Sequence, residues 1–340
     1  MPRIAGILLT GIFLAQTGVA GEITDMKGRK VVVPENIKKL YAPSPYGAFM
    51  MYAIAPDLMS GLIFLPQDED RKYLNKYLQN LPVIGSLSGE SQAANLEVLL
   101  KSKPDVLIVW TGKDTQVSEK MQKTLDTLNI PYVYVAVDTM SDYPEALRFL
   151  GKLLKREERA EKMAAYCSKT LADVNTAVSK IPASRKPKVY YAEGVDGLST
   201  ECNDSIHVEL LTLAGDVDIH RCHTSSHMGM EKISLEQVIL YNPDIIVAQE
   251  RFFYDRVFKD PAWQQVRAVK EGRVVLIPKT PFNWFDRPPS FMRFLGLKWL
   301  TNHLYPTEYP LDIKKEIRFF YSSFLGVELD EQDVQKILVQ

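Results

Sequence analysis

Two stretches of the chain share one pattern of hydrophobic and polar positions. Residues 95–110 read NLEVLLKSKPDVLIVW and residues 234–249 read SLEQVILYNPDIIVAQ, with Leu, Glu, a Pro-Asp pair and a closing apolar run at nearly matching offsets. Each copy predicts a polar helix cap, at Asn95 or Ser234, then a short amphipathic helix, a turn and a strand. A short apolar run that does not alternate is typical of a parallel strand covered on both faces. The repeat therefore predicts two similar α/β lobes.

The rest of the chain alternates between the same two kinds of element. Strands are predicted at 38–42, 61–64, 105–110, 132–137, 188–193, 217–219, 244–249 and 273–278. Helices are predicted near 46–54, 68–80, 94–102, 116–128, 206–214, 234–241, 261–268, 290–304, 308–324 and 330–338. Strands that alternate with helices predict a mostly parallel sheet in each lobe.

A different pattern separates the two halves. From Tyr143 to Ile181 apolar residues recur at every third or fourth position, and only Gly151 interrupts them weakly. This spacing predicts one long helix over 143–181, ended by PASRKP at 182–187. The expected order is a first lobe over 21–142, the connecting helix over 143–181 and a second lobe over 182–340.

Residues 1–20 have the composition of a cleavable signal peptide. Arg3 precedes an apolar stretch from Ile4 to about Ala15, and the small residues Gly18 and Ala20 stand where a signal peptidase would cut. The apolar stretch is short for a membrane span, so a retained anchor is the weaker alternative. No cysteine follows it, so no lipid anchor is expected. The segment predicts export to the periplasm.

Composition and cysteine content agree with an exported globular protein. The chain is 46% hydrophobic and 24% charged, and its net charge of −1 without long basic runs argues against nucleic acid as a partner. Three cysteines in an oxidising compartment fit one disulfide and one thiol. Cys202 and Cys222 lie in loop-like sequence and are predicted to pair, whereas Cys167 lies on an apolar helical stripe and is expected to be buried.

The two repeats, the long helix and DPAWQQVRAVKEGRVVLIP at 260–278 together resemble the substrate-binding proteins of ABC importers for ferric siderophores, haem and cobalamin. The resemblance covers nearly all of the chain after the predicted signal peptide. It implies two Rossmann-like lobes joined by a single rigid helix, with the ligand in the cleft between them. It also implies a dimeric permease as partner, with Glu97 and Glu236 as docking residues of a monomeric binding protein. The simpler alternative is that each Glu only stabilises the first turn of its helix.

In open α/β sheets, ligands bind beyond the carboxyl ends of the strands. Trp284 would offer a stacking surface there, and Arg287 a cation for a carboxylate, a catecholate or an oxyanion. The alternative is that Phe282 and Phe285 belong to the core and Arg287 is paired internally. The strand-end rule places the following residues around the ligand: Tyr46, Ser86, Trp110, Glu193, Arg251, Asn283, Trp284 and Arg287.

The segment HRCHTSSHMGM at 220–230 is rich in histidine. His223 and His227 are candidate ligands for a metal with open coordination positions, although a loop histidine is often only solvated. Tyr46, Tyr191 and Tyr254 are alternative oxygen ligands for Fe(III).

The sequence contains none of the common catalytic or phosphate-binding motifs, such as GxGxxG after a strand, the P-loop, HExxH or GxSxG. We therefore expect no enzyme and no cofactor, and an iron complex as ligand. A metal ion or oxyanion, such as nickel, molybdate or tungstate, is the alternative within transport. An α/β enzyme such as a chelatase or a dehydrogenase is the alternative of another class, because fold alone does not decide function.

Overall fold

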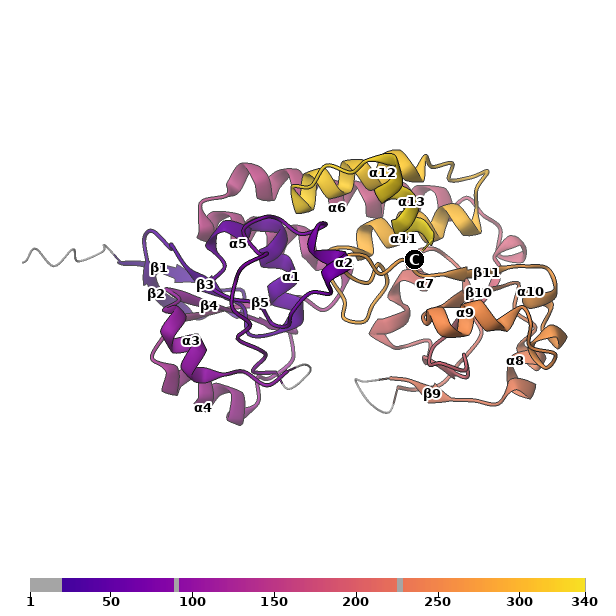
Figure 1. The fold of residues 1–340 in the computed structure, drawn as a ribbon, viewed down its shortest axis with the longest axis horizontal. Coiled ribbons are helices and arrows are strands. Elements are labelled where there is room, and N and C mark those ends of the chain that lie inside the picture. Colours follow the sequence, from indigo (N-terminus) through magenta and orange to yellow (C-terminus); the bar gives the residue numbers. More distant parts are fainter. Residues whose placement is uncertain (1–19, 89–91, 225–228, 340) are drawn as a thin grey trace, which may run out of the picture.

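The computed structural model describes residues 20–88, 92–224 and 229–339, and the predicted signal peptide lies almost wholly outside these residues. Two α/β lobes lie side by side, with helices along one side of both (Figure 1). The first lobe holds a parallel sheet in the order β3-β4-β5 and the second a parallel sheet in the order β11-β10-β6-β8. The α/β fold with parallel sheets is confirmed. The strands of these sheets are β3 (Leu40–Tyr41), β4 (Val106–Thr111), β5 (Tyr132–Ala136), β6 (Lys188–Ala192), β8 (Val217–Asp218), β10 (Ile245–Ala248) and β11 (Val274–Leu276).

Two small antiparallel pairs complete the strands. They are β1 (Ala20–Thr24) with β2 (Lys30–Pro34), and β7 (Ser199–Thr200) with β9 (Glu231–Lys232). The α-helices of the first half are α1 (Pro45–Ile54), α2 (Asp68–Arg71), α3 (Leu96–Ser102), α4 (Glu119–Leu128), α5 (Tyr143–Leu154) and α6 (Glu157–Val178). Those of the second half are α7 (Glu209–Leu213), α8 (Leu235–Tyr241), α9 (Arg251–Val257), α10 (Arg267–Lys270), α11 (Arg293–Leu304), α12 (Ile313–Phe320) and α13 (Glu331–Val339).

The repeated sequence units fold alike as helices α3 and α8. The side chain of Asn95 accepts the backbone N–H of Val98 at 3.1 Å, and that of Ser234 accepts the N–H of Gln237 at 3.2 Å. These bonds satisfy N–H groups that have no partner inside the helix. Each helix then ends at a residue with left-handed backbone, Lys103 or Asn242.

The Pro-Asp pair of each repeat links its strand to the neighbouring strand. Asp105 accepts the backbone N–H of Lys39 at 2.9 Å, beside the start of β3, and Asp244 accepts that of Lys188 at 2.8 Å, at the start of β6. The recurrence of Asp therefore reflects the same link between parallel strands in both lobes.

The prediction of a single helix over 143–181 is wrong. The chain forms two helices, α5 and α6, because Lys155 adopts a left-handed backbone with φ 56°. The two helices pack closely at this turn, where a Cβ on Gly151 would lie 2.4 Å from the Cβ of Ala160. Glycine thus permits the close approach instead of only weakening a helix. The helix that connects the lobes is α6, of 22 residues.

Two smaller predictions also differ from the structure, and one helix was missed. Residues 61–64 form no strand, and only Leu62 makes an isolated bridge, to Val83. The helix expected over 68–80 ends at Arg71 as α2, and farther along the side chain of Asn75 accepts the N–H of Tyr77 in a turn. Helix α9 was not predicted.

The two lobes share part of their core. One buried cluster runs from the first lobe through α6 to α11, α12 and α13, and the rings of Phe49 and Phe282 lie 4.1 Å apart within it. Strand β6 contributes Val189 and Tyr191 to this cluster and Tyr190 and Ala192 to a second cluster on its other face. The two lobes are therefore joined by buried hydrophobic packing.

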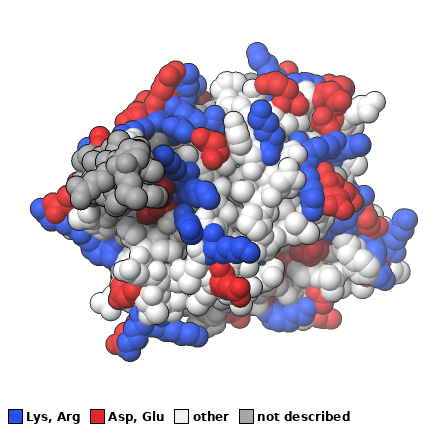
Figure 2. All heavy atoms as spheres, turned by 60° about the vertical axis from the view of Figure 1, so that its left-hand side comes forward, with Lys and Arg blue, Asp and Glu red and all other residues white. Residues whose placement is uncertain are grey.

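The surface carries both signs of charge. Acidic and basic side chains are interspersed over the face in Figure 2, and neither sign covers it continuously. Within the described residues, no helix is both long and apolar enough to cross a membrane.

Candidate functional site

A cleft of about 590 Å³ opens between the two lobes. It lies at the carboxyl ends of β4 and β5, as the strand-end rule predicts for the first lobe. Six lining residues carry its chemistry: Tyr46, Trp110 and Tyr143 from the first lobe, and His207, Arg287 and Arg293 from the second.

The first-lobe wall is aromatic. Tyr46, in the first turn of α1, stacks on Trp110 with ring centroids 6.4 Å apart and planes inclined by 18°. Trp110 also contacts Tyr143, at 5.7 Å between centroids. Helix α1 starts at this wall because Ser44 caps it and Pro45 occupies its first turn. The wall offers flat surfaces for planar or apolar parts of a ligand.

The second-lobe wall is built around the guanidinium of Arg287. Its nitrogens pair with the carboxylates of Glu193 and Glu201, and Nε lies 3.6 Å from Asp286 Oδ2. The side chain of Arg287 is 21% exposed, whereas the three acids are buried. Burial raises the pKa of Glu193 to about 8, and the charge of Asp286 reinforces this shift while the hydrogen bond from Arg287 opposes it. The acids that pair with Arg287 are buried, and the exposed part of its side chain lines the cleft.

A second buried chain of contacts starts at Asp286. Its Oδ1 accepts a hydrogen bond from the Tyr191 hydroxyl at 2.7 Å, and its Oδ2 lies 2.8 Å from Nδ1 of His207. His207 belongs to the short 3-10 helix η4 (Ile206–Val208), and its backbone N–H donates to the Ser205 hydroxyl at 3.2 Å.

Arg293 links the second-lobe wall to the first lobe. Its guanidinium lies 2.8 Å from Glu209 Oε2, and the other oxygen of Glu209 accepts the backbone N–H of Met140 at 2.8 Å. Arg293 also donates to the Phe285 carbonyl at 3.0 Å. One carboxylate thus joins both lobes at the base of the cleft.

The structure brings only part of the predicted ligand set together. Tyr46, Trp110 and Arg287 line the cleft, and Glu193 lies beneath Arg287. The expected stacking role of Trp284 is wrong, because Trp284 is fully buried and its indole N–H donates to the Thr280 carbonyl at 3.1 Å.

The other predicted ligand residues have structural contacts. Asn283 is buried against Gln249 at 3.2 Å, and buried Ser86 donates to the Pro43 carbonyl at 3.0 Å. Arg251 begins α9 and pairs with Asp255 at 2.8 Å, away from the cleft lining.

Of the two predicted metal ligands, the structure describes only His223, which does not line the cleft. His223 is exposed and lies 3.1 Å from Asp204, while His227 lies outside the described residues. Tyr254 packs on Phe258 in α9, and Tyr191 is buried against Asp286.

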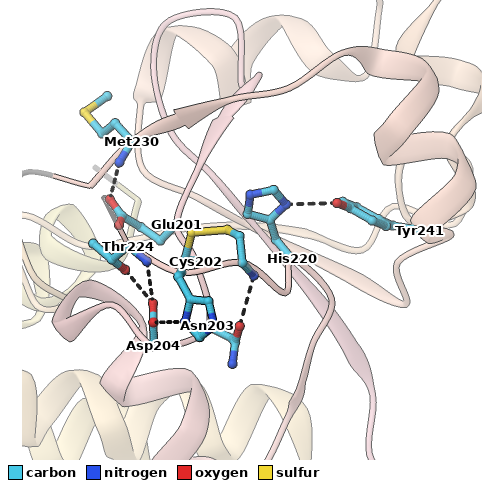
Figure 3. Close-up of a disulfide and its surroundings, with 10 residues drawn as sticks. Glu201, Cys202, Asn203, Asp204, His220, Thr224, Met230 and Tyr241 are labelled. Carbon is cyan, nitrogen blue, oxygen red and sulfur yellow. Dashed lines mark hydrogen bonds and ion pairs between the residues drawn. A yellow bond between two sulfur atoms is a disulfide. The ribbon is translucent and has the colours of Figure 1, made fainter. Parts of the chain in front are cut away.

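Cys202 and Cys222 form a disulfide (Figure 3). Cys167 is a buried free cysteine. Burial raises the pKa of the Cys167 thiol. Among the described residues, Cys202, His220 and Cys222 form the group with metal-ligand spacing, but both sulfurs are committed to the disulfide. We therefore assign this group a structural role.

Sequence reasoning missed His207, Arg293 and the two acids Glu201 and Asp286. His207 lies within an apolar stretch that predicts only a helix, and Glu201 is hidden beside Cys202. The charged pair Asp286-Arg287 directly before two prolines was the one local signal available.

Two parallel-sheet lobes, a connecting helix and a cleft with one aromatic and one charged wall define a two-lobe solute-binding protein. A profile of the periplasmic binding protein family matches residues 67–281, and the chain belongs to this family. It is 23% identical to the molybdate-binding protein MolA of Haemophilus influenzae, over 89% of this chain and 90% of the relative. It is 21% identical to the Fe(3+)-citrate-binding protein YfmC of Bacillus subtilis, over 80% of this chain and 85% of the relative.

Solved structures agree with the family. An ABC transporter solute-binding protein from Sulfurospirillum deleyianum is 40% identical and superposes with a TM-score of 0.85, over 94% of this chain and 99% of that one. The matched family consists of periplasmic binding proteins, and this structural neighbour is a solute-binding protein of an ABC transporter. The enzyme alternative is therefore not supported. Membership of the family also implies the periplasm as its compartment.

Proposed function

We propose that the cleft captures an anionic metal complex, in first place a ferric siderophore-like complex, for delivery to an ABC importer. The main observation behind this proposal is that the two walls of the cleft differ in chemistry. Tyr46 and Trp110 present stacked rings on one side, and Arg287 presents a guanidinium backed by buried acids on the other. Such a cleft suits a ligand with both aromatic or apolar parts and negative charge.

Cleft size supports a complex over a small ion. Its volume of about 590 Å³ falls within the roughly 300–1,000 Å³ typical of pockets for organic ligands of drug size. The guanidinium groups of Arg287 and Arg293 line the second wall, where a negative group of the ligand can pair with them, and Asp138 adds one carboxylate to the first wall.

An oxyanion is the second candidate. Full-length similarity to a molybdate-binding relative favours it, whereas the iron-citrate-binding relative fits the first candidate. The aromatic wall and the room left around a small oxyanion favour the larger complex.

We further propose that Glu97 and Glu236 dock the protein on a dimeric permease. Both are exposed, and each follows an equivalent helix cap at the start of α3 or α8. In Figure 1 these helices lie on the side of the two lobes opposite α6. Two equivalent carboxylates on two similar lobes match a partner with two similar halves.

Titration calorimetry of the ligand-free protein tests the ligand class. The panel comprises ferric catecholate, ferric citrate, haem, cobalamin, molybdate and Ni(II). We expect one of the iron complexes to bind at least tenfold more tightly than molybdate or Ni(II). Tight binding of Ni(II) with no binding of the anionic complexes would refute the proposal, and molybdate as the tightest ligand would favour the second candidate.

A further inference from the structure

Three further residues of the first lobe line the cleft and give its aromatic wall a polar part. Gly112 and Thr115 follow strand β4, and Asp138 follows β5. These positions are the carboxyl ends of two neighbouring parallel strands, where ligands of such sheets bind. The side chains of Thr115 and Asp138 are exposed. The first lobe therefore presents hydrogen-bond acceptors to a ligand as well as flat rings.

Gly112 allows two of these acceptors to come together. A Cβ on Gly112 would lie 2.5 Å from Asp138 Oδ1 and 2.5 Å from Thr115 Oγ1, so both oxygens approach the same side of this residue. Any side chain at position 112 would displace them. The glycine thus leaves room for a carboxylate oxygen and a hydroxyl beside each other in the cleft wall.

Backbone contacts orient the carboxylate of Asp138. Its Oδ2 accepts the backbone N–H of Lys113 at 3.0 Å. The backbone N–H of Asp138 donates in turn to Asp142 Oδ2 at 3.0 Å. The oxygen directed at Gly112 is therefore Oδ1, and the hydrogen bond at Oδ2 keeps it there.

The two lysines near this part of the wall have other partners. The ammonium of Lys113 lies 2.5 Å from Asp142 Oδ1, and that of Lys27 donates to the carbonyls of Gly112 and Thr115 at 3.4 Å. None of the ion pairs among the described residues includes Asp138. The carboxylate at the cleft surface is thus left for a cation of the ligand.

We propose that Asp138, together with Thr115, selects metal complexes whose chelator carries an ammonium group. This inference rests on the proposed function and narrows its ligand: the anionic part meets Arg287 and Arg293 at the second wall, and a cationic arm meets Asp138 at the first. An ammonium group has three N–H donors, so it can bond to the carboxylate and the hydroxyl at once. Charge-assisted hydrogen bonds of this kind are stronger than neutral ones.

Two ferric catecholates that differ in one group test the inference. One carries a primary amine on its linker, and in the other the same amine is acetylated. By titration calorimetry at pH 7, we expect the wild type to bind the amine complex about fivefold more tightly, the upper range for an exposed ion pair. Asp138→Asn should abolish this preference by weakening the amine complex alone, and Thr115→Val should reduce it in part.

Controls separate selection from folding. Asp114→Asn removes an exposed acid of the same loop that does not line the cleft, so it should keep the wild-type preference. Thermal unfolding of Asp138→Asn should match the wild type, because the amide oxygen can still accept the N–H of Lys113. Equal wild-type affinity for both complexes, or equal weakening of both in Asp138→Asn, would overturn the inference and leave the proposed function intact. If the wild type binds neither complex, the proposed function itself fails, and this inference with it.

Discussion

Arg287 forms an ion pair with Glu201, the residue that directly precedes Cys202 in the disulfide to Cys222. The chain beyond Cys222 returns to the same acid, because the backbone N–H of Met230 donates to Glu201 at 2.9 Å. Figure 3 shows Glu201 and Met230 beside the disulfide. The disulfide thus fixes the backbone next to a carboxylate that positions a cleft arginine.

The first prediction concerns Arg287. Arg287→Ala leaves three buried acids without their cation, so we expect the free energy of unfolding to fall by about 3–5 kcal/mol, as for other broken buried ion pairs. Arg287→Lys should lose less, because it keeps the charge but not the fork. Urea denaturation measures both. A variant of wild-type stability that only loses ligand binding would show that Arg287 is not engaged by these acids.

The second prediction concerns pH. Because the pKa of Glu193 is raised to about 8 in the folded protein, the folded state binds more protons than the unfolded state between the ordinary carboxyl pKa and 8. This contribution to stability is fully present below the ordinary pKa and is lost as the pH rises through 8. Glu193→Gln should flatten this part of the stability profile. Unfolding free energies measured from pH 5 to pH 9 would contradict the assignment if both proteins gave the same slope.

The third prediction separates the tryptophans. Trp110 lines the cleft and Trp284 is fully buried, so ligand binding should change the fluorescence of Trp110 alone of these two. Trp110→Phe should abolish most of the change, and Trp110→Ala should weaken binding by about 1–2 kcal/mol. Trp284→Phe is the matched control and should keep the signal. If the fluorescence change were lost only in Trp284→Phe, the prediction would be wrong and Trp284 would be the tryptophan that contacts the ligand.

The fourth prediction tests docking. Glu97→Ala combined with Glu236→Ala should abolish uptake through the reconstituted importer and leave ligand affinity in solution unchanged, since both residues lie outside the cleft lining. Glu119→Ala removes another exposed acid from the first turn of a helix, α4, and should transport normally. Normal uptake by the double variant would contradict the docking proposal and would favour the alternative that each Glu only stabilises the first turn of its helix.

Most of the helices and strands could be predicted from the local pattern of hydrophobic and polar residues. The caps at Asn95 and Ser234 appear as expected, because each side chain bonds to a backbone N–H within its own helix turn. The aspartates of the two Pro-Asp pairs instead bond to residues distant in sequence, Lys39 and Lys188. The break between α5 and α6 was missed because apolar spacing continues across Lys155, and only the packing of Gly151 on Ala160 reveals the turn.

The site was harder to predict for a similar reason. Strand ends located Tyr46 and Trp110, since position along a parallel strand decides which end faces the opening. Whether Trp284 faces ligand or core depends on contacts with residues distant in sequence, and so does the approach of His207 to Asp286. No local spacing encodes either relationship.

Native mass spectrometry of the protein isolated from periplasm, with metal analysis of whatever copurifies, tests the central claim most directly. We expect a bound mass that corresponds to an organic chelator together with stoichiometric iron, and release of both by denaturation. A mass increase equal to a bare divalent metal ion, with no organic component, would contradict a cleft built for an anionic metal complex.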